Sequence, residues 1–258
     1  MTTRPPQPEN DARKSGRKTR GRARQLVLDL PLAPGMGRED FLETPANAAA
    51  LRAISHWPSG AEGEAHALVL IGPEGSGKSH LAEIWRLEND ALKAHAADLR
   101  VEAVPHLLAR GALVLEDLPA DAARAPEWET ALFHLLNMAR QEGAHVLLTS
   151  CRSPARWPVA LPDLRSRLAA LPVAEIEPPD DMLLRAVLVK LCTDRQLLVP
   201  EEVISYLLTR MERSLTAARQ LVAALDAASL REKRRITRPL AARVLAELTQ
   251  GEKAQNRD

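Results

Sequence analysis

The chain has 258 residues, 45% of them hydrophobic and 27% charged, which is ordinary for a globular protein with one large core or two smaller ones. Only two cysteines occur, Cys151 and Cys192, far apart and without histidines at metal-ligand spacing. This composition excludes a disulfide framework and gives no indication of a zinc site. No apolar run has the length of a signal peptide or a membrane span, so we expect a cytoplasmic protein.

Residues 1–24 form a strongly basic segment. They hold eight lysines or arginines and two acids, a net charge of +6 against +1 for the whole chain, so the remainder carries −5. After Met1 the segment has no aliphatic side chain larger than alanine, and we expect it to be disordered because it cannot offset the entropy of ordering. Such a tail either holds nucleic-acid phosphates through counterion release or acts only as a solubilising arm.

A short apolar island, QLVLDLPL, follows at residues 25–32 and leads into a linker that ends at residue 36. An isolated segment of this kind either adds a strand to the edge of the main domain or docks into a groove on another protein. Gln25, Leu28 and Leu30 fit the pattern Q-x-x-L-x-[LF].

Residues 45–56 then have apolar residues at helical spacing, with Asn47 as a capping residue.

The most specific motif begins where the apolar run Ala67 to Ile71 ends. Gly72, Gly77, Lys78 and Ser79 fit GxxxxGK[ST], with a helical pattern directly behind, which is the order strand, glycine loop, helix. The lysine of this motif, Lys78, would reach the β and γ phosphates, and the hydroxyl of Ser79 would ligate Mg²⁺. The predicted nucleotide-binding segment is therefore Gly72, Pro73, Glu74, Gly75, Ser76, Gly77, Lys78, Ser79 and His80.

A second apolar run, Ala112 to Leu115, ends in the paired acids Glu116 and Asp117. Between the glycine loop and this run we expect a weak strand at 91–97 and a short helix at 101–110 that is broken near Pro105. A buried parallel strand of this kind delivers its carboxylates to the phosphate site, one to the Mg²⁺ shell and the other to the attacking water. The alternative is a plain strand that ends in two exposed acids.

Two further elements could contribute polar groups to the same site. After a predicted core helix at 127–141, the strand 145–150 ends in Thr149 and Ser150, which either sense the γ phosphate or simply cap the strand. The short helix 161–168 carries Arg165 and Arg167. These arginines either form a solvated face or include an arginine finger that reaches a neighbouring subunit's nucleotide.

Beyond the strand 173–176 the pattern is helical throughout, with predicted helices at 180–194, 201–211, 215–231 and 239–248. Arg219 lies among apolar residues of the third helix and is either a boundary ion-pair residue or a charge aimed at the nucleotide cleft. The predicted fold is a P-loop α/β domain at 37–177, in which helices flank a parallel sheet. A small all-α domain at 178–249 and a polar, disordered tail at 250–258 complete it.

The order of these motifs resembles the AAA+ ATPases and, among them, the DnaA/Hda family. The resemblance spans about Gly37 to Leu248 and rests on GPEGSGKSH, LVLED, WETALFHLLN, LLTSCRSP, LPDLRSRL, EIEPPDDMLLRAVL and the helix of Arg219. It implies ADP or ATP as the cofactor with Mg²⁺, held by Ser79, Glu116 and Asp117. It also implies Thr149, Ser150 and Cys151 as sensor 1, Arg219 as sensor 2, Asp117 as a catalytic residue and Arg167 as an arginine finger in trans.

The resemblance also implies partners. The peptide with Gln25, Leu26, Leu28 and Leu30 is similar to those that bind the sliding clamp of the DNA polymerase, and contact with DNA would follow through the clamp or the basic tail. Only 37 residues separate Lys78 from Glu116, and no helix-turn-helix pattern follows the last helix, which favours the regulatory branch of the family. Such a protein stimulates hydrolysis of ATP held by DnaA and so limits initiation of replication, with weak hydrolysis of its own and with homo-oligomerisation left open. Two alternatives are a self-contained AAA+ ATPase or loader and a DNA-binding accessory protein that works through residues 1–24.

Overall fold

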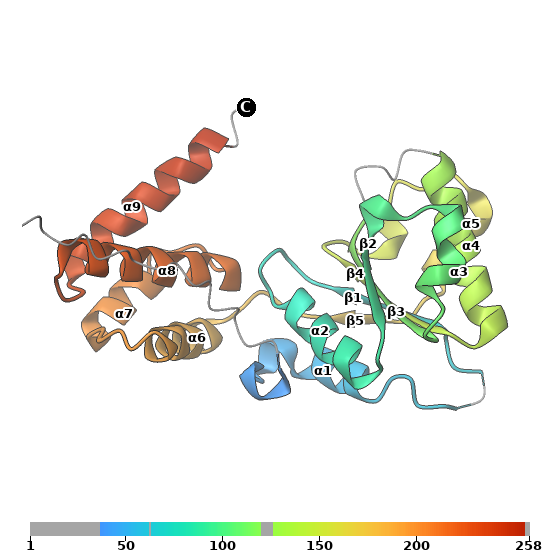
Figure 1. Ribbon diagram of the computed structural model, residues 1–258, viewed down its shortest axis with the longest axis horizontal. Helices are drawn as coiled ribbons and strands as arrows, with labels where there is room; N and C mark the ends of the chain where they lie inside the picture. Colours follow the sequence, from blue (N-terminus) through green and yellow to red (C-terminus); the bar gives the residue numbers. More distant parts are fainter. Residues whose placement is uncertain (1–36, 62, 120–125, 256–258) are drawn as a thin grey trace, which may run out of the picture. The chain divides into compact units, whose positions relative to one another are not determined.

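The computed structural model describes residues 37–61, 63–119 and 126–255, and Gly35–Asp258 form one compact unit. The basic tail and the predicted clamp-binding peptide lie outside the described residues. The centre of the unit is a five-stranded sheet in the order β2-β3-β4-β1-β5, in which all neighbouring strands are parallel. This arrangement, with helices on both faces and a helical domain that follows the sheet domain in the chain, confirms the predicted fold class (Figure 1).

The elements follow the sequence patterns closely. The strands are β1 (Ala67–Ile71), β2 (Leu92–His95), β3 (Ala112–Leu118), β4 (His145–Ser150) and β5 (Val173–Glu175). The helices of the sheet domain are α1 (Pro45–Ser55), α2 (Lys78–Glu88), α3 (Val104–Leu107), α4 (Pro126–Glu142) and α5 (Pro162–Ala169). The helical domain contains α6 (Asp181–Asp194), α7 (Glu201–Leu208), α8 (Leu215–Glu232) and α9 (Arg238–Gln255).

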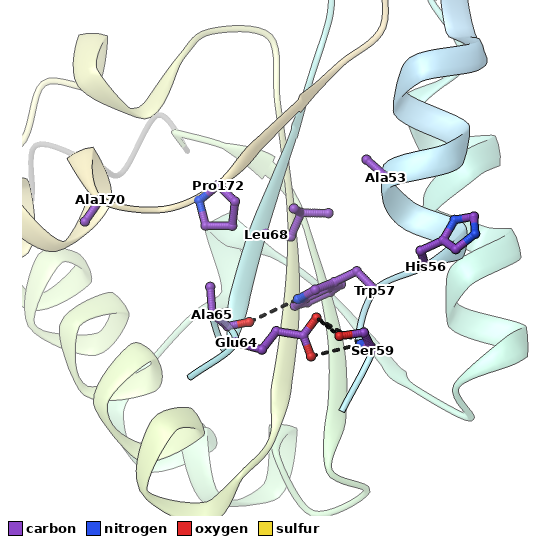
Figure 2. Close-up of a pocket in the computed structure, with 9 residues that line it drawn as sticks. All are labelled: Ala53, His56, Trp57, Ser59, Glu64, Ala65, Leu68, Ala170 and Pro172. Atoms are coloured by element: carbon purple, nitrogen blue, oxygen red, sulfur yellow. Dashed lines mark hydrogen bonds between the residues drawn. The ribbon is translucent and has the colours of Figure 1, made fainter. Parts of the chain in front are cut away.

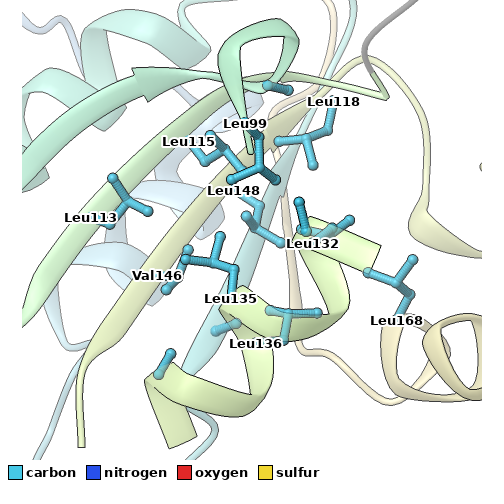
Figure 3. Packing of buried hydrophobic residues seen from close by; sticks show 14 of the residues in the cluster. Leu99, Leu113, Leu115, Leu118, Leu132, Leu135, Leu136, Val146, Leu148 and Leu168 are labelled. Carbon is cyan, nitrogen blue, oxygen red and sulfur yellow. The ribbon is translucent and has the colours of Figure 1, made fainter. Parts of the chain in front are cut away.

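Alternation along the strands divides the core of the sheet domain between two faces. Leu113 and Leu115 of β3 point to the face covered by α4, where they pack with Leu132 and Leu135 of that helix (Figure 3). Val114 lies on the opposite face, in a cluster with residues of α1 and α2. Because both faces are covered, the strands are apolar nearly throughout.

The helices α6 to α9 form a separate core, in which Leu184, Leu188, Val222 and Leu225 are fully buried. Two of these helices begin at side-chain caps, since Asp180 accepts a hydrogen bond from the Leu183 N–H and Ser214 accepts one from the Ala217 N–H. No helix of the described ranges is long and apolar enough to cross a membrane.

Three local features refine the expectations. Asn47 stabilises the start of α1 from inside the helix, because its Oδ1 accepts the Thr44 N–H at 2.8 Å. The segment 101–110, expected to be a short helix broken near Pro105, is a 3-10 turn at Val101–Ala103 followed by the one-turn helix α3, in which Pro105 has no N–H to donate. The last helix, α9, continues to Gln255, into the segment expected to be a disordered tail.

Two leucines on α2 test this packing. Leu81 is fully buried, whereas Leu87 of the same helix is 56% exposed. We expect Leu81→Ala to lower the free energy of unfolding by about 2–5 kcal/mol because it leaves a cavity in the core. Leu87→Ala should change it by less than about 0.5 kcal/mol. Urea denaturation of both variants measures the difference, and equal losses would contradict the assignment of the buried face of α2.

Candidate nucleotide-binding site

The glycine loop connects the end of β1 to the start of α2 through backbone that requires glycine. Gly75 has a φ of 67° and Gly77 a φ of 103°, both in the left-handed region. At Gly72 a Cβ atom would lie 2.7 Å from the Ile176 carbonyl oxygen. All three glycines of the motif are therefore needed for the loop to turn between the strand and the helix.

Lys78 is the centre of polar contacts in this loop. Its ammonium group donates hydrogen bonds to the carbonyl oxygens of Gly72 (2.9 Å) and Pro73 (2.8 Å) and lies 3.5 Å from Cys151 Sγ. The buried Ser76 hydroxyl has no hydrogen-bond partner among the described residues. An ammonium group and an unpaired hydroxyl on a glycine loop fit a phosphate group, which accepts hydrogen bonds and carries negative charge.

His80 follows the motif and is buried against the segment that precedes α1. Its Nε2 lies 3.1 Å from the Gly37 carbonyl oxygen, which can only accept, so the proton is on Nε2. The ring of Phe41 meets the imidazole edge to face at 5.3 Å. Burial lowers the pKa of His80, and the positive charge of Arg219 acts in the same direction. We therefore expect His80 to be neutral at pH 7.

The helical domain contacts the same loop from α8. The N–H of Leu215, the first residue of α8, donates a hydrogen bond to the Gly75 carbonyl oxygen at 2.8 Å. Arg219, one turn further along α8, is half-buried, and burial lowers its pKa. Within the described ranges Arg219 forms no salt bridge, so the expected boundary ion pair is not observed there and the charge acts on His80 instead.

The two acids at the end of β3 point in different directions. Glu116 is 3% exposed, and its Oε2 forms a salt bridge with Lys93 Nζ at 2.6 Å. Asp117 has a φ of 64°, and its exposed carboxylate lies 3.3 Å from His95 Nδ1. A break in the register of β3 with β4 between Leu115 and Leu118 causes this divergence. No group of three or more His, Cys, Asp or Glu that could hold a metal occurs in the described part of the chain.

The hydroxyls at the end of β4 are used within the fold. Thr149 Oγ1 accepts the Asp117 N–H at 3.1 Å, and Ser150 Oγ accepts hydrogen bonds from the Arg152 N–H and the Trp157 indole N–H. Both residues are 1% exposed. These contacts favour strand capping for Thr149 and Ser150. The exposed Cys151, and not Thr149 or Ser150, is the residue at this strand end whose side chain faces Lys78. The sequence indicates this position only by placing Cys151 directly after an apolar strand.

Arg167 lies on α5, and its guanidinium group is 5.2 Å from the centre of the Phe133 ring on α4. This cation–π contact holds the charge at the surface between the two helices. Across the described residues, Arg167 forms no salt bridge and donates no side-chain hydrogen bond. Arg165 on the same helix is exposed and lacks the aromatic contact. The two arginines of the predicted finger helix are therefore distinguishable.

A separate cavity of about 480 Å³ lies near the start of β1, whereas the glycine loop follows the end of that strand (Figure 2). Trp57 and Leu68 supply much of its apolar wall. The Glu64 carboxylate at its rim accepts hydrogen bonds from the N–H and hydroxyl groups of Ser59, which lower its pKa. This carboxylate is saturated by its own loop, and the cavity is not part of the nucleotide site.

Comparison with solved structures places this geometry in a known fold. Domain III of the replication initiation protein DnaA from Thermotoga maritima superposes with a TM-score of 0.69 at 22% identity, covering 84% of this chain and 98% of that one. AMPPCP-bound DnaA from Aquifex aeolicus gives a TM-score of 0.62 at 18% identity, covering 75% of this chain and 65% of that one. The RuvB Holliday junction branch migration motor of Thermotoga maritima gives a TM-score of 0.64 at 16% identity, covering 83% of this chain and 72% of that one.

The helical domain is more specific, because residues 181–245 match the family model described as the Hda lid domain. We refer to residues 181–245 as the Hda-type lid. The described unit as a whole has the fold of DnaA domain III. The Hda-type lid contains α6, α7, α8 and part of α9, and therefore includes Arg219 and the contact between Leu215 and Gly75.

The buried imidazole of His80 predicts a pH effect on stability. Because its pKa in the folded state is lower than in the unfolded state, the unfolded chain binds the extra proton as the pH falls below about 6.5. Stability should therefore fall between pH 7 and pH 5, and His80→Gln should remove part of that loss. Urea denaturation at pH 7 and pH 5 measures this loss of stability in wild type and variant. The same pH dependence in wild type and variant would contradict a neutral, buried His80.

Proposed function

We propose that this chain is an AAA+ adaptor that binds an adenine nucleotide and, together with the DNA polymerase sliding clamp, stimulates hydrolysis of ATP bound to DnaA. The observation that carries this proposal is the match of residues 181–245 to the Hda lid domain. In this function the protein limits initiation of replication. Its own nucleotide serves to hold the base and the Hda-type lid in one arrangement.

The glycine loop supports the nucleotide part of the proposal. Lys78 would turn from the loop carbonyls to the phosphates, the Ser76 hydroxyl would donate to a phosphate oxygen, and Arg219 would approach from the lid. The DnaA structure from Aquifex aeolicus holds AMPPCP, which favours an adenine nucleotide here. Ser79 is the loop residue that would contact Mg²⁺, which neutralises phosphate charge when bound. The Asp117 carboxylate points to His95, so we expect the chain to hydrolyse its own nucleotide only weakly.

Arg167 is the residue we propose to act on DnaA. Its guanidinium group is held over Phe133 without an acidic partner in the described structure, so its donors can reach a γ phosphate on another molecule. An arginine supplied in this way stabilises charge in the transition state and raises phosphoryl-transfer rates by roughly 10³–10⁵-fold. The chain therefore needs no hydrolysis of its own to act.

The sliding clamp is proposed as the second partner from the sequence of residues 25–30, which lie outside the described residues. Gln25, Leu26, Leu28 and Leu30 would insert into a groove of the clamp as an extended peptide. DNA would then be brought near through the clamp. Binding to the clamp would raise the local concentration of the adaptor where replication has begun.

The direct test measures how fast ATP bound to DnaA becomes ADP when this protein is added, with and without the sliding clamp loaded on DNA. The proposal predicts acceleration that requires the clamp. Alanine at Gln25 and Leu28 together should abolish both clamp binding and the acceleration. No acceleration in the presence of the loaded clamp would overturn the proposal.

A matched pair of variants tests the arginine. We expect Arg167→Ala to lower the stimulated rate of DnaA-bound ATP hydrolysis by roughly 10³-fold or more, because the transition-state charge loses its donor. Clamp binding should be unchanged. Arg165→Ala on the same helix is the control and should retain the rate. Full activity of Arg167→Ala would show that another group supplies the charge.

A further inference from the structure

Lys93 forms an ion pair with the carboxylate that a Mg²⁺-dependent site would use. Lys93 lies on β2, beside β3, and its Nζ is 2.6 Å from Glu116 Oε2. The side chain of Lys93 is 36% exposed, whereas that of Glu116 is 4% exposed. The carboxylate is therefore buried in the protein, and the cation reaches it from the edge of the sheet.

The position of Glu116 on β3 fixes the face on which this pair lies. Ala112 and Val114 belong to the cluster that packs under α2, and strand alternation places Glu116 on the same face. The helix α2 begins at Lys78, so the carboxylate lies on the side of the sheet covered by the glycine-loop helix. An uncompensated negative charge there would repel phosphates.

The pairing has a physical cause. A carboxylate buried to this extent is costly in free energy unless it is paired with a cation or coordinates a metal. Lys93 provides such a cation as part of the fold. Asp117 cannot take over the role, because the backbone turn at that residue directs its carboxylate to His95 at 3.3 Å. The charge that a divalent ion would neutralise at Glu116 is already neutralised.

We propose that Lys93 is the fixed counter-ion of Glu116 and allows this protein to hold its adenine nucleotide without a requirement for Mg²⁺. Lys93 is a positioning and charge-compensating residue rather than a catalytic one. The inference rests on the proposed nucleotide binding and deepens it, because it explains how the site retains a nucleotide as a structural ligand. Glu116 Oε1, buried and without a partner in the described structure, remains open to a water.

The first test compares ADP affinity in excess Mg²⁺ and in EDTA, measured by calorimetry on the full chain. We expect the two dissociation constants to agree within about twofold. Glu116→Gln should leave both nearly unchanged, since the carboxylate holds no metal in this account. A wild-type affinity that is more than about tenfold tighter with Mg²⁺, and loses this difference in Glu116→Gln, would overturn the proposal.

The second test removes the cation. Lys93→Met leaves the Glu116 charge uncompensated, so ADP affinity in EDTA should fall by about tenfold or more, and Mg²⁺ should restore it. The double variant Lys93→Met with Glu116→Gln should bind equally in both conditions, which also shows that loss of Lys93 has not unfolded the site. Lys93→Arg is the matched control and should behave like wild type. Equal affinity of Lys93→Met in Mg²⁺ and EDTA would overturn the assignment.

These measurements separate two kinds of failure. If wild type binds neither ADP nor ATP in any condition, the proposed nucleotide function fails and the role of Lys93 fails with it. If wild type binds ADP only with Mg²⁺, the nucleotide function stands and only the role of Lys93 is overturned.

Discussion

The backbone of the glycine loop is the constraint on which the rest of the site depends. The chain must leave the buried strand β1, turn through left-handed conformations at Gly75 and Gly77 and enter α2 at Lys78. Glycine makes this turn accessible. Once it is made, the N-terminus of α2, the carbonyls that hold Lys78 and the first residue of α8 all meet at one loop. A nucleotide bound there would contact both the base and the Hda-type lid.

The charged side chains at this edge of the sheet fit nucleotide binding better than nucleotide hydrolysis. Lys78 and Arg219 bring positive charge without salt-bridge partners in the described ranges, while the negative charge of Glu116 is neutralised by Lys93. Asp117 is turned away by the irregular pairing of β3 and β4. Arg167, by contrast, is partly exposed and packs over the Phe133 ring. This division fits a protein whose own nucleotide is structural and whose effect is on the ATP of a partner.

The sequence predicted what depends on local spacing and left out what depends on tertiary contacts. The glycine loop, the strand β4 and the helices of the lid were predicted because turn residues and apolar periodicity are visible within one segment. The different directions of the Glu116 and Asp117 side chains could not be predicted in this way. They depend on the positive φ of Asp117, which occurs where the register of β3 with β4 is broken. Nor could spacing show that Lys93, 23 positions before Glu116, would pair with it across two strands. Capping was one of two roles that the sequence left open for Thr149 and Ser150, and the choice between them required Asp117 and Trp157 to be placed first.

The measurement that tests the central claim most directly is equilibrium binding of ADP to the full chain by calorimetry, with Lys78→Ala as the variant and Lys190→Ala as the control. Lys190 is a partly exposed lysine of α6 that pairs with Asp40 and Asp194, so its loss removes a positive charge outside the glycine loop. The account predicts that one ADP binds per chain, that Lys78→Ala loses at least about tenfold in affinity, and that Lys190→Ala stays close to wild type. An affinity that is unchanged in Lys78→Ala, or no binding by the wild-type chain, would contradict the claim that this glycine loop holds an adenine nucleotide.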